Sequence, residues 1–265
     1  MKKIVLFLFA VVFLCRCTDF EYSPHQVFDG KSSVALNNKN LARLLQTPAD
    51  DTLRFVVAGD SQAAENDVSL FVKTVNGIPG IDLIFLAGDI SEFGALQEME
   101  WLAGEFKRLK APYLGVIGNH DLLGNGSKVF ERMFGARNYA FVYGGVKFVC
   151  HDTNSREYNF NGKVPDIDWL KSELAADENV NFYIPVAHVR PYTTDFDASL
   201  STPYTDALNS NPKTLASFYA HDHSFGEYRP NNSRIPLIVT TSLGERGFLL
   251  VEIVNGQLTY ERINF

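Results

Sequence analysis

Short apolar runs alternate with helical patterns in the first half of the chain. Residues 53–58, 83–87 and 113–117 are mostly apolar runs of strand length. A polar helical pattern at 64–75 follows the first run, and a pattern at 96–109, with apolar residues three or four positions apart, follows the second. The alternation is typical of a β-α-β-α-β unit. It predicts an α/β fold with a parallel sheet and right-handed crossovers.

The second half of the chain is richer in runs of strand character. Gly144-Gly145 and Asn255-Gly256 each separate two such runs by two residues, which is typical of a tight hairpin. This pattern predicts a second sheet that contains antiparallel pairs. The predicted strands lie at 139–143, 146–150, 181–187, 217–220, 236–240, 248–254 and 257–263.

Two polar segments are interpreted differently. Residues 18–51 contain turn signals such as Ser23-Pro24 and Asn37-Asn38, so we expect an irregular tether and lead-in segment, with the folded domain at 52–265. The stretch between Pro191 and Pro212 is rich in Thr, Ser, Asp and Pro. Its length predicts a functional loop near His188.

The N-terminus has the pattern of an export signal. Lys2 and Lys3 precede an uninterrupted apolar stretch at 4–14, which is too short for a bilayer span and fits a signal-peptide core. The stretch ends in Cys15-Arg16-Cys17, which resembles a bacterial lipoprotein signal over residues 1–17. We expect an exported, membrane-anchored protein of the cell envelope, with Cys17 favoured over Cys15 as the lipidated residue. Simple secretion after cleavage, giving a periplasmic or secreted protein, is the alternative.

Composition narrows the classes of partner. With 265 residues and 46% hydrophobic residues the chain can bury a sizeable core. Its formal net charge of -7 argues against a protein that neutralises the nucleic-acid backbone, so no nucleic-acid partner is predicted. Cys150 is the only cysteine beyond the signal region and is interpreted as a buried strand residue, so no disulfide framework is expected.

Polar side chains that can bind metal follow several of the predicted strands. Because the carboxyl ends of parallel strands meet at one edge of a sheet, these segments should lie close together. Taken singly, each Asp or Asn could form a turn or cap a helix, and each His could be structural or solvent-exposed. Together they predict a metal site. The segments are Gly59-Asp60-Ser61-Gln62, Gly88-Asp89-Ile90-Ser91-Glu92, Gly118-Asn119-His120-Asp121, His188 and His221-Asp222-His223.

Two cations that share a bound water can activate it and can stabilise the oxygens of a phosphoryl group. A mixed Asp, Asn and His shell suits such a pair. The five segments resemble the calcineurin-like metallophosphoesterase superfamily over residues 53–225, and Gly118-Asn119-His120-Asp121 is the most distinctive of them. The resemblance implies a sandwich of two mixed sheets flanked by helices.

The resemblance also implies roles for the site residues. Asp60, Asp89 and His223 would hold one ion, with Gln62 in the place of the usual histidine. Asp89 would bridge to a second ion held also by Asn119, His188 and His221. His120 would be the catalytic residue that stabilises the transition state or protonates the leaving oxygen, and Asp121 would orient its imidazole. The two ions would be divalent or trivalent, namely Mn, Fe, Zn or Ni.

Two positions depart from the family pattern. Gln62 replaces a nitrogen donor by an amide, which can bind through its carbonyl oxygen, act through a water, or fail to bind. Ala220 stands where the family has glycine before the final His-x-His, a small change that we expect to be tolerated.

The expected function is hydrolysis of a phosphomonoester or phosphodiester by metal-bound hydroxide, with a phosphorylated substrate of unknown class. The alternative is a surface binding lipoprotein of the same fold, weakly active or inactive because its first metal position has decayed at Gln62. A zinc peptidase is disfavoured because no His-Glu-x-x-His segment is present. Substrate specificity is expected to come from the loops at 154–163 and 193–211.

Overall fold

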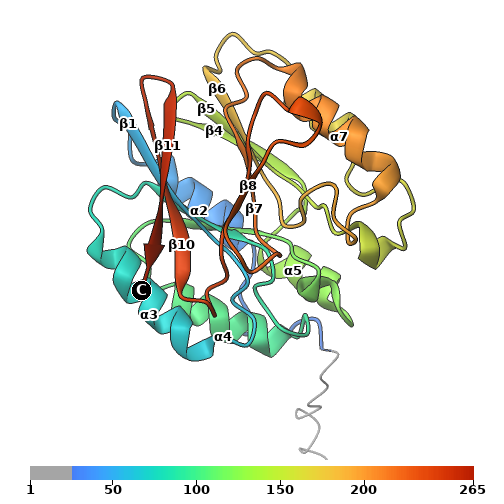
Figure 1. Ribbon diagram of the computed structural model, residues 1–265. Coiled ribbons are helices and arrows are strands. Elements are labelled where there is room, and N and C mark those ends of the chain that lie inside the picture. Colours follow the sequence, from blue (N-terminus) through green and yellow to red (C-terminus); the bar gives the residue numbers. More distant parts are fainter. Residues whose placement is uncertain (1–25) are drawn as a thin grey trace, which may run out of the picture.

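The computed structural model describes residues 26–265, which form two β-sheets packed face to face with helices on both outer surfaces (Figure 1). The strand order in the first sheet is β11-β10-β1-β2-β3, and in the second it is β4-β5-β6-β7-β9-β8. The first sheet comprises β1 (Thr52–Ala58), β2 (Leu83–Ala87), β3 (Tyr113–Val116), β10 (Gly247–Val254) and β11 (Gln257–Asn264). The second comprises β4 (Tyr139–Tyr143), β5 (Val146–Cys150), β6 (Phe182–Val186), β7 (Ser217–Tyr219), β8 (Gly226–Tyr228) and β9 (Leu237–Val239).

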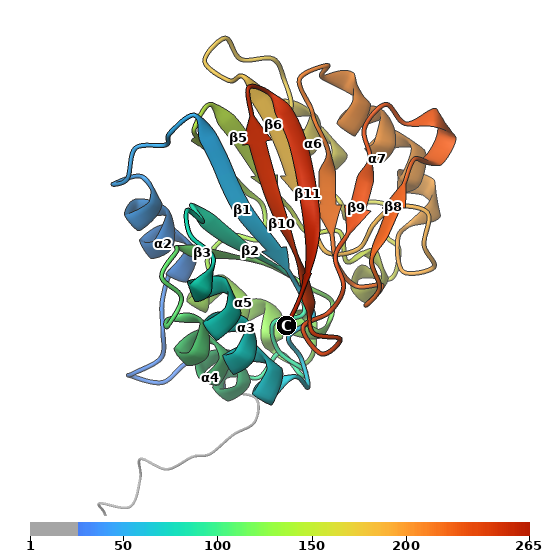
Figure 2. The same ribbon diagram turned by 60° about the vertical axis from the view of Figure 1, so that its left-hand side comes forward.

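Helices cover the two outer faces (Figure 2). Helices α3, α4 and α5 pack on the first sheet, and α6 and α7 pack on the second. Short 3₁₀ helices lie at His120–Leu122, Ser155–Tyr158 and Pro230–Asn232. The α-helices are α2 (Leu36–Leu44), α3 (Glu65–Gly77), α4 (Leu96–Phe106), α5 (Gly126–Met133), α6 (Ile167–Glu173) and α7 (Ala198–Ser210).

The apolar core lies between the sheets and beneath the helices. Strand β1 contributes to both sides: Phe55 and Val57 face the second sheet, whereas Val56 and Ala58 face the helices. This is why its sequence is a nearly continuous apolar run and does not alternate with polar residues. Phe55 packs edge-on against aromatic rings of both sheets. The α/β fold with two mixed sheets flanked by helices is confirmed, as are the parallel order β1-β2-β3 and both hairpins.

The second hairpin joins a different sheet from the one expected. Strands β10 and β11 extend the first sheet, because β10 pairs antiparallel with β1 (Figure 1). Every residue of β10 from Gly247 to Ile253 is buried or half-buried, so this strand is central and β11 forms the edge. Its hairpin turn predicted the pairing with β11. The choice of sheet depends on the free side of β1, which is distant in sequence.

The irregular character expected for all of residues 18–51 is wrong at 36–44, where helix α2 packs beside β3. Strand β3 is the edge of the first sheet, and two asparagines of α2 cover part of that edge. The Asn37 amide donates to the carbonyl of Gly115 (2.9 Å) and accepts from its N–H (2.7 Å), and Asn40 accepts from the N–H of Tyr113 (3.4 Å). The asparagines that signalled a turn therefore replace the hydrogen bonds of a missing neighbouring strand.

The predicted loop at 193–211 is also wrong, because most of it is helix α7. Asp197 caps the helix by accepting the N–H of Ser199 (3.0 Å), and Pro203 lies inside it. The apolar residues Leu200, Tyr204, Ala207 and Leu208 have helical spacing, a signal that the polar composition of the segment concealed.

A buried chain of hydrogen bonds fastens α7 to the second sheet. Ser217 donates to Tyr219 (2.8 Å), the Tyr219 and Tyr204 hydroxyls are 2.9 Å apart, and Tyr204 lies 2.8 Å from Nε2 of His151. Nδ1 of His151 is 3.1 Å from the carbonyl oxygen of Val149. A carbonyl only accepts, so Nδ1 carries the proton, Nε2 accepts from Tyr204, and the imidazole is neutral.

This neutral histidine makes the fold sensitive to acid. Burial lowers the pKa of His151 from 6.5 to about 4, so the unfolded chain binds its proton more readily than the folded one. The stabilisation is present above pH 6.5 and is lost as the pH falls towards 4. Between pH 7.5 and 4.5 we expect the wild type to lose about 2 to 3 kcal/mol more unfolding free energy than His151→Gln, measured by urea titration. Equal losses would contradict this assignment.

The predicted signal peptide and the lipidation candidates Cys15 and Cys17 lie outside the described residues. None of the helices described in residues 26–265 is long and apolar enough to cross a membrane. Cys150 is a free, buried strand residue, as predicted.

Candidate metal centre

The predicted metal-binding residues converge at the carboxyl edge of both sheets. Asp60, Asp89 and Asn119 follow β1, β2 and β3, and the three histidines His188, His221 and His223 follow β6 and β7. Four of these residues have backbone conformations that are uncommon for residues other than glycine. The φ angles are 54° at Asp60, 51° at Asp89, 71° at His221 and 53° at His223. Strain of this kind clusters at functional sites, where it aims side chains that a relaxed turn would direct elsewhere.

The glycines of the predicted segments allow the loops to approach closely. A Cβ at Gly118 would lie 2.0 Å from the backbone nitrogen of Asp89, and one at Gly88 would lie 2.3 Å from Nδ1 of His188. Any side chain at these positions would push the ligand loops apart. Close packing of strand ends therefore explains why glycine precedes the polar residues.

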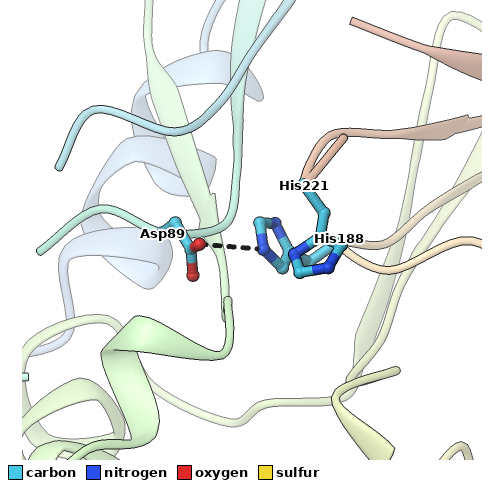
Figure 3. A group of neighbouring side chains, drawn as sticks. All are labelled: Asp89, His188 and His221. Atoms are coloured by element: carbon cyan, nitrogen blue, oxygen red, sulfur yellow. Dashed lines mark ion pairs between the residues drawn. The ribbon is translucent and has the colours of Figure 1, made fainter. Parts of the chain in front are cut away.

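One set of donor atoms gathers around His188. Its Nε2 lies 3.2 Å from Oδ2 of Asp89 and 3.0 Å from Oδ1 of Asn119. Asp89, His188 and His221 each place one potential ligand atom within 4.8 Å of the others (Figure 3). Nδ1 of His188 is 2.8 Å from the carbonyl oxygen of Ala87, a contact that fixes the ring with Nε2 towards the carboxylate.

A second set gathers around His223. Its Nε2 lies 3.5 Å from Oδ1 of Asp60 and 3.3 Å from Nε2 of Gln62. The same Gln62 nitrogen is 3.4 Å from Oδ2 of Asp89. Asp89 therefore contacts both sets and lies where the sequence predicted a bridging ligand.

These spacings fit metal coordination. Two ligands held about 2.1 Å from one ion, at octahedral or tetrahedral angles, lie roughly 3.0 to 3.4 Å from each other. The donor separations in the two sets are 3.0 to 3.5 Å. The mixed oxygen and nitrogen donors suit Mn, Fe, Zn or Ni.

The charges of the site also favour a bound cation. Burial raises the pKa of Asp60 to about 7. Burial alone would lower the pKa of His188, but the adjacent carboxylate of Asp89 and the charge of Asp60 raise it to about 10. Burial tends to raise the pKa of Asp89, yet His188 holds it below its usual value. Two buried carboxylates thus depend on positive charge nearby, which metal ions would supply more strongly than a protonated histidine.

Gln62 has an unpaired atom at this site. Its Oε1 is buried without a hydrogen-bond partner, while its Nε2 points between Asp89 and His223. Oxygen and nitrogen of an amide are assigned from hydrogen bonding, and an imidazole can accept the N–H placed here. Turning the amide by 180° would put the carbonyl oxygen among the donors of the second set. Gln62 is thus placed to complete that set through oxygen.

His120 lies at the rim of the two sets and is part-buried. Its backbone N–H donates to Oδ1 of Asp89 (2.8 Å), and its Nδ1 lies 2.9 Å from the carbonyl oxygen of Glu92. Burial would lower the pKa of His120, but the contact with the Glu92 carbonyl and the charges of Asp89 and Glu92 raise it. A raised pKa favours an imidazolium, which can donate a proton from Nε2.

The predicted contact between Asp121 and the His120 ring is not present, because the carbonyl of Glu92 occupies that role. The buried Asp121 carboxylate accepts instead from the N–H groups of Ile90, Ser91 and Gly118, at 2.8 to 3.1 Å, and from the Ser91 hydroxyl. Asp121 therefore ties together the two loops that carry Asp89 and His120. Side-chain spacing could not reveal this role, since its partners are backbone amides of another loop.

Asp195 is a residue that the sequence did not single out. Its Oδ2 is 2.9 Å from Nε2 of His221, and its Oδ1 pairs with Arg156 at 2.6 Å. With Nε2 engaged, Nδ1 is the His221 atom available for an ion. Asp195 lies in the segment interpreted as a specificity loop, and no local pattern links it to a histidine beyond the following helix.

We expect Asp195→Ala to weaken metal binding about 10-fold or more, because the His221 ring loses the partner that fixes its orientation. Metal affinity is measured by competition with a chromophoric chelator. Asp168→Ala, on the exposed first turn of α6, is the control and should bind metal as the wild type does. Unchanged affinity in Asp195→Ala would assign Asp195 to the Arg156 ion pair alone.

Two other sequence candidates have structural partners. Arg190 pairs with Asp222 (2.7 Å) and lies 3.8 Å from the centre of the Tyr228 ring. Asp152 accepts from Tyr158 (3.0 Å) and from the amide of Asn154 (2.8 Å). These contacts hold the loops around the centre.

Comparison with known proteins agrees with this geometry. The calcineurin-like phosphoesterase family matches residues 53–225, more than half of the chain. The chain belongs to this family. It is therefore a metallophosphoesterase with a candidate His/Asp metal site, and the family typically binds two metals.

The chain is 27% identical over 88 residues to a probable cyclic nucleotide phosphodiesterase of Xenorhabdus bovienii, covering 33% of this chain. It is 27% identical over 128 residues to a probable cyclic nucleotide phosphodiesterase of Fibrobacter succinogenes, covering 44% of this chain. The matches span 30% and 48% of the lengths of these two relatives.

Solved structures share the fold at low sequence identity. A purple acid phosphatase from yellow lupin matches with a TM-score of 0.64 and 14% identity, over 82% of this chain and 52% of that protein. A dimetal phosphatase from Danio rerio matches with a TM-score of 0.62 and 13% identity, over 80% of this chain and 99% of that protein. These similarities support the two-sheet architecture described above.

Proposed function

We propose that this metallophosphoesterase binds two metal ions and hydrolyses a phosphodiester, or a phosphomonoester, of a small molecule. The observation that carries the proposal is the position of Asp89. Its carboxylate contacts both His188, in the first set of donors, and Gln62, in the second. Two adjoining sets with one shared carboxylate are the arrangement needed for a pair of ions about 3.5–4 Å apart.

Such a pair, when bound, supplies a nucleophilic water and positive charge for the phosphoryl oxygens. The chain itself supplies the remaining functions. Asp121 holds the loops after β2 and β3 in register, so that Asp89 and His120 keep their relative positions. The Glu92 carbonyl holds Nδ1 of His120, which leaves Nε2 to donate a proton to the leaving oxygen.

The preference for a diester rests on the two relatives, each named a probable cyclic nucleotide phosphodiesterase. The experiment is elemental analysis of the protein starting after Cys17, with turnover of bis-p-nitrophenyl phosphate and p-nitrophenyl phosphate. We expect about two metals per chain and faster turnover of the diester. One metal or none, with no turnover after addition of Mn, Zn, Fe or Ni, would favour the binding lipoprotein instead.

We also propose that the protein is exported and anchored to a membrane of the cell envelope through a lipid on Cys17, on the basis of the N-terminal pattern. Cell fractionation tests this. Cys17→Ala should move the protein from the membrane fraction to the soluble one, whereas Cys15→Ala should leave it bound. The opposite pair of results would assign the anchor to Cys15.

A further inference from the structure

A pocket of about 410 Å³ adjoins the metal centre and shares Gln62 and Glu92 with it. Its far wall is formed by the loop after β2, through Phe93, and by helix α4, through Gln97 and Trp101. The pocket therefore begins where the proton donor and the second set of donors end. A molecule with its phosphate at the ions would project its next group into this space.

Two large aromatic side chains of this pocket are left in water. Phe93 is 63% exposed and Trp101 is 44% exposed. Exposed apolar residues are common singly, but two aromatic residues around one hollow beside a reactive centre are a feature of ligand sites. Phe93 also lines a neighbouring pocket with Leu123, which is 40% exposed, so neither pocket encloses its ring.

The loop that carries Phe93 is fixed to the catalytic groups. The N–H of Phe93 donates to Oε2 of Glu98 (2.9 Å), and the N–H of Gly94 donates to the hydroxyl of Ser91 (3.1 Å). The preceding carbonyl, of Glu92, is the one that binds the His120 ring. The aromatic ring is thus attached to a short, hydrogen-bonded segment, which limits the entropy lost when a ligand stacks on it.

The charges of the pocket restrict its occupant. None of the described residues that line it is Lys or Arg, whereas Glu92 and Glu98 are carboxylates. A second anionic group would be repelled here, but a planar group bearing N–H donors would be accepted. Aromatic faces together with hydrogen-bond acceptors and amides are the chemistry that recognises a nucleobase.

We propose that this pocket binds the base of a nucleotide phosphoester, with Phe93 and Trp101 as the stacking surfaces. The inference rests on the proposed function, because it places the phosphate at the metal centre, and it specifies the substrate class. Phe93 and Trp101 act in specificity and contact the base, not the reacting atoms.

Binding tests the pocket without turnover. AMP and ribose 5-phosphate are titrated into the metal-loaded protein by calorimetry. We expect AMP to bind at least about 10-fold more tightly, because only AMP has a base. Phe93→Ala and Trp101→Ala should each weaken AMP binding about 5- to 100-fold and leave ribose 5-phosphate unchanged. Phe28→Ala is the matched control: Phe28 is 61% exposed, stacks with Arg132 and lines neither pocket.

Equal affinity for AMP and ribose 5-phosphate would overturn the inference, as would wild-type AMP affinity in both variants. A soluble short-chain phosphatidylcholine is the third ligand. If Phe93→Ala weakens its binding and leaves that of AMP intact, the pocket serves lipid and not a base. If the protein binds AMP as expected but hydrolyses no phosphoester, the proposed function fails while the pocket assignment holds. Hydrolysis of aliphatic esters without base-dependent binding gives the reverse result.

Discussion

Replacing His120 by alanine is expected to lower kcat about 100- to 10,000-fold for a phosphoester with an alkoxide leaving group, because the proton donor to that oxygen is removed. The loss should be smaller for p-nitrophenyl esters, whose phenolate leaves without a proton. His120 donates only its backbone N–H to Asp89, and that donor survives in the variant. Metal content should therefore stay at the wild-type value. Both quantities are measured on the same preparation.

The contrast between the two leaving groups is the decisive readout. A purely structural role for His120 would reduce turnover of both esters equally and would also reduce metal content. Glu92→Gln is the companion variant, because it removes the carboxylate 3.8 Å from Nδ1 of His120 and keeps the carbonyl that binds this nitrogen. It should retain most of the activity with both esters.

Replacing Asp89 by asparagine is expected to remove both metal ions, so that metal content falls from about two per chain to below one. The carboxylate contacts His188 and lies beside Gln62, so both sets of donors lose their shared ligand. Asparagine keeps the size of the side chain and can still accept from the N–H of His120. The loss can therefore be attributed to charge and coordination. Elemental analysis after gel filtration measures it.

Asp67→Asn provides the control for this variant. Asp67 carries a carboxylate of the same kind on α3, where it pairs with Arg246 far from the two sets of donors. Its metal content should match the wild type. Two metals retained in Asp89→Asn would contradict the bridging role and would require each set to bind its ion independently.

Most strands could be predicted from the sequence because their signals are local. The runs at 83–87, 139–143 and 146–150 coincide with β2, β4 and β5, and their burial on one or both faces requires the apolar residues that reveal them. Helices α2 and α7 were missed for one reason. Their sequences are polar because the buried side chains of Asn37, Asn40 and Tyr204 form hydrogen bonds inside the structure.

The sequence by itself determined which residues can bind metal and on which edge of the sheets they lie. Each of these residues follows its strand directly, and parallel strands end at a common edge. Only the tertiary structure decided how they combine: that Asp89 contacts both sets, that Glu92 and not Asp121 holds the His120 ring, and that Asp195 supports His221. The same holds for the pocket of Phe93 and Trp101 beside the centre. These contacts join distant segments, and their geometry depends on the packing of whole loops, which no local pattern encodes.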